Sequence, residues 1–147
     1  MTADTEAIRM IEQSFLVYPV GWVESPLTDR ADAPRQGDEG APPARIVFRP
    51  EFREAATGLQ VGDEVLVLTW LHLASRDVRS VHPRGDMSRP ITGVFATRSP
   101  DRPNPIGLHG VTIEAVDEVG ITVRNLEAIN GTPVLDIKPV LRGVHER

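Results

Sequence analysis

The sequence contains no cysteine. This absence excludes disulfide bonds, thiolate catalysis and any zinc or iron–sulfur site with cysteine ligands. Aromatic residues are also scarce, at 5% of the chain. No apolar run approaches the roughly 20 residues that a membrane-spanning helix needs, and the acidic N-terminus lacks the basic start of a secretory signal. We therefore expect a cytoplasmic protein that does not enter a membrane.

Several motifs of common enzyme classes are missing as well. The chain has neither a glycine-rich dinucleotide loop nor a P-loop, and it has no nucleophile elbow. The net charge of −5 argues against a protein that is basic overall, although a local basic patch would still allow RNA binding. We predict no metal site, because the histidines show no spacing typical of metal ligands; they are His72, His82, His109 and His145.

The size and composition indicate one globular domain. A chain of 147 residues fits a single domain, and 40% hydrophobic with 25% charged residues is ordinary for such a domain. We therefore predict one domain over residues 1–147, with a core at about residues 15–140.

Short β-prone segments, separated by turn signals, determine the expected fold. Residues 28–44 are rich in proline, glycine and aspartate and predict a long loop, which in compact domains is usually functional or mobile. Many short strands with little helix predict an all-β protein, mainly β with short helices, that closes as a single-sheeted β-barrel. The expected strands lie at 15–23, 45–49, 65–71, 92–97, 111–116, 121–127 and 134–137, and one short helix lies at 51–57.

The most unusual stretch is residues 98–107, which contains three prolines. Proline fixes its own φ and restricts the preceding residue, so this stretch predicts a stiff, extended ledge. Such a ledge presents Arg98, Arg102 and Asn104 at little entropic cost and suits an anionic or heteroaromatic ligand. A stiff connection that carries solvated arginines is the alternative.

Weaker signals lie elsewhere in the chain. A Pro-Arg-Gln triplet at residues 34–36 lies in the long loop, and His72 follows the central strand. Asp136 and Lys138 are two positions apart, so on a strand they share a face and can pair. Each of these features also has a purely structural interpretation.

Long matched blocks carry a family resemblance. Residues 93–100, 102–108 and 131–139, together with residues 19–26 and the triplet at 34–36, resemble the TrmO (TsaA-like) family in the same order. The resemblance covers about residues 15–140. It implies a single-sheeted β-barrel that binds S-adenosylmethionine, usually as a homodimer. It also implies tRNA modification, by N6-methylation of N6-threonylcarbamoyladenosine next to the anticodon.

The resemblance also assigns site residues. The implied cofactor-binding residues are Pro34, Arg35, Gln36, His72, Leu73, Arg98, Leu108, Asn125, Leu126, Glu127 and Ala128. Substrate-binding candidates are Arg98, Asp101, Arg102, Asn104 and Lys138. The catalytic base is not assigned, and the candidates are His72, His109 and Asp136.

The chain also departs from the family pattern, chiefly around the implied substrate rim. Asp101 and Val140 replace aromatic residues, His109 replaces serine, Asn130 replaces an acid, and Leu71 replaces phenylalanine. Three hypotheses therefore stay open: a tRNA methyltransferase, a methyltransferase for a small molecule, and a non-catalytic S-adenosylmethionine-binding module. The first predicts salt-dependent binding at a basic patch, formed by Arg76, Arg79, Arg84, Arg98 and Arg102.

Overall fold

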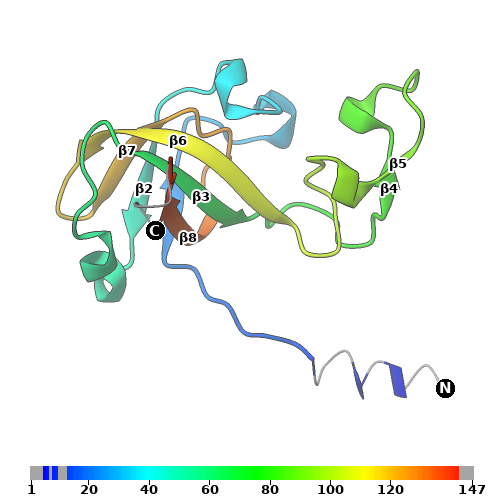
Figure 1. Ribbon diagram of the computed structural model, residues 1–147, viewed down its shortest axis with the longest axis horizontal. Helices are drawn as coiled ribbons and strands as arrows, with labels where there is room; N and C mark the ends of the chain where they lie inside the picture. The colour runs from blue at the N-terminus through cyan, green and yellow to red at the C-terminus, as the bar shows by residue number, and fades with distance from the viewer. Residues whose placement is uncertain (1–4, 7, 10–12, 143–147) are drawn as a thin grey trace.

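A computed structural model of the protein describes residues 5–6, 8–9 and 13–142. Six antiparallel strands form one closed barrel in the order β1-β2-β7-β6-β3-β8 (Figure 1). The predicted all-β class and single-sheeted barrel are therefore confirmed. The barrel strands are β1 (Gly21–Glu24), β2 (Ala44–Phe48), β3 (Glu64–Trp70), β6 (Ile106–Val116), β7 (Gly120–Arg124) and β8 (Pro133–Pro139).

The core fills the inside of this barrel. Successive side chains of a strand point to opposite faces of the sheet, and in β2 and β3 buried and partly exposed residues alternate accordingly. Aliphatic side chains from several strands are fully buried, including Val23, Ile46, Val67, Ile113 and Val123. Barrel closure leaves no free strand edge, so connecting segments lie outside this framework.

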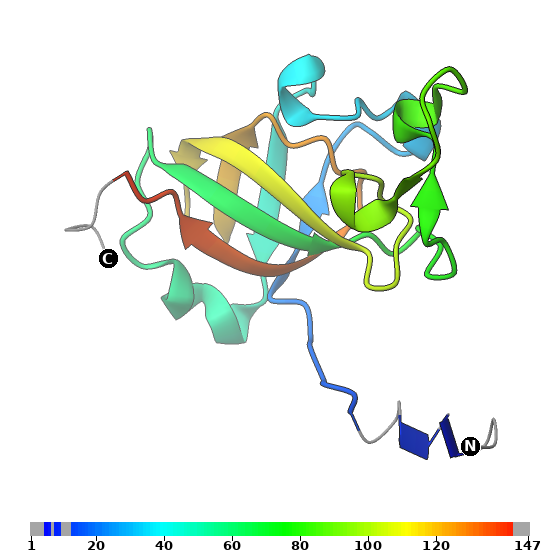
Figure 2. The same cartoon turned by 45° about the vertical axis from the view of Figure 1, so that its right-hand side comes forward.

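Residues 72–104, which make up most of the connection between β3 and β6, form an arm that projects from the barrel (Figures 1 and 2). It contains the two-residue strands β4 (Ser80–Val81) and β5 (Thr92–Gly93), which pair with each other. It also contains the 3₁₀ helices η4 (Pro83–Gly85) and η5 (Val94–Ala96). Val94 is the only buried residue of the arm, so the arm has almost no core of its own.

Three further 3₁₀ helices lie outside the barrel. Two belong to the predicted long loop, η1 (Arg30–Asp32) and η2 (Gly37–Glu39), and Figure 2 shows this loop beside the arm. The third, η3 (Pro50–Ala56), follows β2 and begins with proline at its first turn. This helix confirms the short helix predicted at residues 51–57.

The structure corrects the strands expected at 15–23 and 92–97. The first strand begins only at Gly21, because β8 pairs with Gly21 and Trp22 and offers the preceding residues a single bond, from the Val20 amide to the Val134 carbonyl at 2.8 Å. The strand expected at 92–97 is wrong: after Thr92–Gly93 the chain turns into η5. Its β-prone residues lie in the arm, where no long strand is available to pair with them.

The strand expected at 111–116 begins earlier than predicted. β6 begins at Ile106, directly after the last proline of the ledge, because residues 106–110 pair with β3. Its N-terminal half carries the Gly-Leu-His-Gly run into the barrel wall, and this extension positions the candidate site.

Candidate functional site

A pocket of about 210 Å³ lies where the long loop meets β6 and the segment after β7. Four of the cofactor-binding residues implied by the resemblance line it: Gln36, Leu108, Asn125 and Glu127. They come from three separate parts of the chain, and barrel closure brings them together. The remaining lining residues are Gly37, Asp38, His109 and Gly110.

A close backbone contact holds the loop against the pocket. A side-chain carbon at Gly37 would overlap the backbone carbonyl oxygen of Asn125 and lie 3.0 Å from Oε2 of Glu127. Asn125 has a φ of +69°, in the left-handed region that asparagine tolerates better than most residues. Glycine at position 37 is therefore required for the loop to approach the end of β7.

A buried hydrogen-bond chain connects the pocket to the barrel interior. Oγ1 of Thr69 lies 2.7 Å from Nε2 of His109, and Nδ1 of His109 lies 2.6 Å from Oε1 of Glu127. His109 is 4% exposed and Thr69 is fully buried, whereas the side chain of Glu127 is 15% exposed. Both ring nitrogens of His109 are therefore engaged, and neither reaches the pocket as a free base.

Two ion pairs connect the long loop to the arm. Arg30 donates to the Leu73 carbonyl at 3.2 Å and to Asp101 at 3.3 Å. Arg84 of η4 donates to Glu39 of η2 at 2.6 Å. The hydrogen bond from Arg84 holds the pKa of Glu39 below the ordinary 4.5. The pair is therefore charged at neutral pH and is lost only as the pH falls through that lowered pKa.

The loop triplet at residues 34–36 also faces the arm. Nη2 of Arg35 lies 3.8 Å from the position that a side-chain carbon at Gly85 would occupy. Pro34 is half-buried. The triplet therefore lies between the barrel and η4, with Gln36 at the pocket.

Not all implied cofactor residues line the pocket. His72, Leu73 and Arg98 are exposed on the arm. Leu126 and Ala128 are buried in the barrel core, so their side chains support the pocket segment from inside. The backbone that they anchor carries Asn125 and Glu127 to the pocket.

The proline ledge is held by hydrogen bonds within the arm. Arg102 donates to the Ser99 carbonyl at 3.0 Å, to the Thr97 carbonyl at 2.7 Å and to the Val94 carbonyl. Its guanidinium therefore closes the arm instead of facing solvent. Arg98, by contrast, is exposed and forms no hydrogen bond or ion pair with the residues that the structure describes.

Two other substrate candidates have internal partners as well. Asp101 accepts from the Ser75 amide at 2.8 Å, in addition to its bond with Arg30. Asn104 accepts from Arg76 at 2.8 Å. The aspartate that departs from the family pattern thus joins the ledge to the long loop.

Asp136 and Lys138 pair as the strand periodicity predicts. Their side chains meet at 3.0 Å, and Asp136 lies opposite Leu68 in the register between β3 and β8. Neither residue lines the pocket. The structure therefore separates them from the other site candidates.

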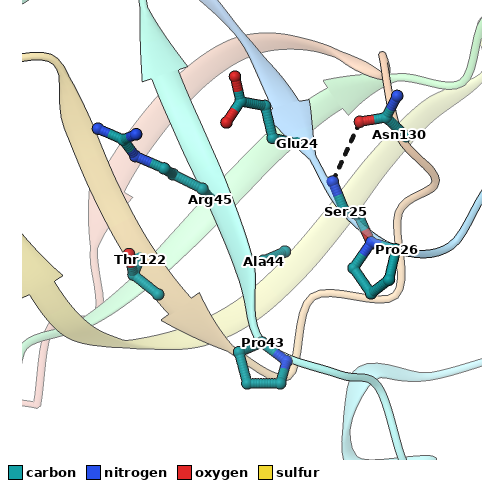
Figure 3. A pocket seen from close by; sticks show the side chains of 8 residues that line it. All are labelled: Glu24, Ser25, Pro26, Pro43, Ala44, Arg45, Thr122 and Asn130. Atoms are coloured by element: carbon teal, nitrogen blue, oxygen red, sulfur yellow. Dashed lines mark hydrogen bonds between the residues drawn. The ribbon is translucent and has the colours of Figure 1, made fainter.

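A larger groove of about 630 Å³ lies where β1 ends and β2 begins (Figure 3). Its residues include Glu24, Arg45 and Thr122, and at one side of it the Ser25 amide donates to Asn130 at 3.1 Å. None of the implied cofactor residues lines this groove. We therefore place the candidate site at the smaller pocket.

Within residues 5–6, 8–9 and 13–142, no group of three or more acidic or histidine side chains could hold a metal ion; His145 lies outside this part. Over the same residues, no helix has the length and apolar character needed to cross a membrane.

Sequence reasoning did not identify three residues that line the pocket, Gly37, Asp38 and Gly110, or Thr69, which bonds to His109. Thr69 is a polar residue in a largely apolar strand, and this feature of the sequence could have identified it. Gly37 and Asp38 directly follow the triplet at 34–36, so the triplet marked the loop that lines the pocket.

A family model for the tRNA-methyltransferase O N-terminal domain matches residues 22–145. The chain belongs to this family. The TrmO resemblance found in the sequence is thus confirmed, and it covers almost the same residues.

Curated relatives of this TrmO-family chain extend over nearly its whole length. It is 45% identical over 130 residues to a probable S-adenosyl-L-methionine-binding protein of Methanothermobacter thermautotrophicus, a match covering 88% of this chain and 93% of that protein. It is 41% identical over 123 residues to an S-adenosyl-L-methionine-binding protein of Archaeoglobus fulgidus, covering 84% and 87%.

Solved structures agree with the barrel. The chain is similar to TrmO from Pseudomonas aeruginosa, with a TM-score of 0.69 and 31% identity, and the match covers 88% of this chain but 57% of that one. A second TrmO crystal structure gives a TM-score of 0.71 at 32% identity. The chain therefore spans little more than half the length of these TrmO structures.

Proposed function

We propose that this S-adenosylmethionine-dependent methyltransferase methylates N6 of N6-threonylcarbamoyladenosine next to the anticodon of a tRNA. The observation that carries the proposal is the pocket, in which Gln36, Leu108, Asn125 and Glu127 converge from three parts of the chain. Membership of the TrmO family and the names of the relatives support the cofactor. The identity of the methyl acceptor is the most specific part of the proposal. We also expect the reaction to take place in the cytoplasm, where tRNA is modified.

The residues of the pocket fit the chemistry of S-adenosylmethionine. This cofactor carries a sulfonium and an ammonium group, and the carboxylates of Asp38 and Glu127 complement positive charge. Gln36 and Asn125 supply amide donors and acceptors, and Leu108 supplies apolar surface. Oε2 of Glu127 accepts no hydrogen bond from the described residues, so it can receive a donor of the cofactor.

The protein contributes to this reaction mainly by positioning the acceptor and the cofactor. When bound, S-adenosylmethionine would supply an electrophilic methyl group: the bond between its sulfonium sulfur and the methyl carbon would break, leaving a thioether, as the acceptor nitrogen bonds to that carbon and gives up a proton. Holding the nitrogen and the methyl group close together and in line supplies several kcal/mol of barrier reduction, and no covalent residue is needed. Among the candidate bases, His109 has both nitrogens engaged and Asp136 pairs with Lys138. His72 is exposed and unpaired among the described residues, which makes it our proposed base.

Unpaired arginines on and against the arm support an anionic acceptor. Arg35, Arg79 and Arg98 form no ion pair with residues 5–6, 8–9 and 13–142, whereas Arg84 pairs with Glu39 and Arg76 bonds to Asn104. These three guanidinium groups, which lack an ion-pair partner in the described part of the chain, would bind phosphates of an RNA in spite of the net negative charge. Such binding weakens steeply as salt rises.

Thermal unfolding with S-adenosylmethionine, and with ATP as the control, tests the cofactor. Ligand at about 100 times its dissociation constant stabilises a protein by roughly 2.7 kcal/mol. For a domain of this size we expect the melting temperature to rise by about 5–10 °C. No rise at millimolar S-adenosylmethionine would contradict the proposal.

The acceptor needs a second measurement. Labelled methyl transfer to tRNA from cells that lack N6-methylation, compared with fully modified tRNA, distinguishes the hypotheses. Transfer only to the unmethylated tRNA supports our proposal. Transfer to a metabolite but not to tRNA favours the small-molecule enzyme, and binding without any transfer favours the non-catalytic module.

We also propose that the active form is a homodimer whose interface includes the arm. Large apolar side chains of the arm are exposed, and Phe95 is 86% exposed. Contiguous exposed apolar patches mark interaction surfaces. Met87, Ile91 and Leu73 are exposed on the same arm, and Ile106 and Leu108 are exposed on the neighbouring outer face of β6.

A charge on the arm is expected to dissociate this dimer. Phe95→Asp would place a carboxylate in a desolvated interface, so we expect the molar mass in light scattering to halve at micromolar concentration. Phe15→Asp is the matched control, because Phe15 is 91% exposed but lies in the N-terminal segment. A wild-type protein that is already monomeric would contradict the proposed dimer.

A further inference from the structure

The most unusual polar feature of the barrel is His109, because its side chain points inward from β6 among aliphatic neighbours. Its cross-strand partner in the register is Val67, which is fully buried, and Val111 follows on the same face. A buried imidazole is costly unless its nitrogens are hydrogen-bonded. Both are bonded here, to Thr69 and to Glu127.

The space for this ring is made by Gly107. A side-chain carbon at position 107 would overlap Oγ1 of Thr69 and lie 2.6 Å from Nε2 of His109. Gly107 lies directly opposite Thr69 in the register between β3 and β6. The barrel wall is thus shaped around the contact between threonine and histidine.

The direction of the hydrogen bonds follows from the partners. An ionised carboxylate only accepts, so Nδ1 of His109 carries the proton and donates to Oε1 of Glu127 at 2.6 Å. Nε2 then faces the hydroxyl of Thr69 at 2.7 Å, which fixes the plane of the ring. A fixed ring in turn fixes one carboxylate oxygen of a side chain that otherwise has three rotatable bonds.

The second oxygen of Glu127 lies next to the long loop. Oε2 lies beside Gly37, 3.0 Å from the position of a side-chain carbon there, and the pocket is lined by both residues. It accepts no hydrogen bond within the described part of the chain. The buried hydrogen bonds of His109 therefore preorient Glu127, and its Oε2 is one acceptor available at the pocket.

We propose that His109 is a positioning residue, which orients Glu127 so that Oε2 accepts a hydrogen bond from the bound cofactor. The inference rests on the proposed function, because it concerns the same pocket. It excludes His109 as the base that removes the proton of the acceptor. A preoriented group loses less conformational freedom on binding, so the orientation strengthens affinity.

Two amide variants separate the contributions of the two hydrogen bonds that His109 forms with Thr69 and Glu127. Asparagine places its amide near Nδ1 of the imidazole, so His109→Asn keeps a donor for Glu127. Glutamine places its amide near Nε2, so His109→Gln keeps the contact with Thr69 but loses the donor. Both substitutions remove the ring, so their effects on barrel packing are similar.

The experiment is calorimetric titration of each full-length variant with S-adenosylmethionine, together with its melting temperature without ligand. We expect His109→Asn to bind within about threefold of wild type and His109→Gln about tenfold more weakly, with similar melting temperatures, since one charge-assisted bond is lost. Equal affinities of the two variants, with wild type binding, would overturn the inference alone. No binding by wild type would overturn the proposed function and this inference with it.

A measurement on the wild-type protein tests the same inference if the variants fail to fold. Nitrogen-15 spectra of the histidine rings report which nitrogen carries the proton. We expect a protonated Nδ1 in His109, with a proton resonance that shifts when S-adenosylmethionine is added. A His109 signal that is unprotonated at Nδ1, or unchanged by the cofactor, would overturn the positioning role.

Discussion

Replacing Leu126 with alanine is expected to lower the melting temperature by about 5–15 °C. Leu126 is 0% exposed and belongs to the barrel core. Truncating a buried leucine leaves a cavity and costs about 2–5 kcal/mol, and each kcal/mol shifts the melting temperature of a domain of this size by about 3 °C. Thermal unfolding followed by circular dichroism measures the effect.

The control for this substitution is Leu141→Ala. Leu141 is 47% exposed, so we expect a change in unfolding free energy within about 0.5 kcal/mol. Since Leu126 also anchors the segment that carries Glu127, its loss should weaken S-adenosylmethionine binding at temperatures well below unfolding. An unchanged melting temperature for Leu126→Ala would show that the segment is not packed as described.

Replacing Gly37 with alanine is expected to weaken cofactor binding tenfold or more. The new side-chain carbon would overlap the Asn125 carbonyl, and neither backbone can yield without moving the loop away from β7. The pocket lined by Gln36 and Glu127 would then open. We expect the ligand-free melting temperature to fall by only a few degrees, because the loop lies outside the barrel. Titration with S-adenosylmethionine measures the loss.

Gly40→Asn is the matched control in the same loop. Gly40 has a φ of +103° and nothing lies within 4 Å of its added side-chain carbon. Asparagine is the residue after glycine that best tolerates a positive φ. Cofactor affinity close to that of wild type is therefore expected, and equal losses in both variants would contradict the proposed role of the Gly37 contact.

The barrel could be predicted from local patterns because its strands obey simple periodicity. Apolar residues in β2 and β3 face the core at alternate positions. The strand expected at 92–97 failed for a complementary reason: its residues have β propensity, but the arm supplies no long partner strand. Propensity measures how well a residue fits a sheet, and it cannot say whether a neighbouring strand exists.

The site could be predicted only in part. The triplet at 34–36 and the segment 125–128 were identified by resemblance, but the contact between His109 and Glu127 joins residues 18 positions apart. That contact exists because β6 and β7 are adjacent in the barrel and β6 begins earlier than expected. The hydrogen bonds of Arg102 within the arm could not be predicted from the sequence either, because they depend on how the ledge folds back onto η5.

Closure of the barrel has a consequence for how such a protein diverges. Every barrel strand is hydrogen-bonded on both sides, so the scaffold does not depend on the loop at residues 25–43 or on the arm for its edges. The length and the charge of these segments can therefore change in related sequences while the barrel stays folded. The ion pair between Asp101 of the arm and Arg30 of the loop joins two segments outside the barrel wall, so a change in either segment can be accommodated without disturbing the barrel.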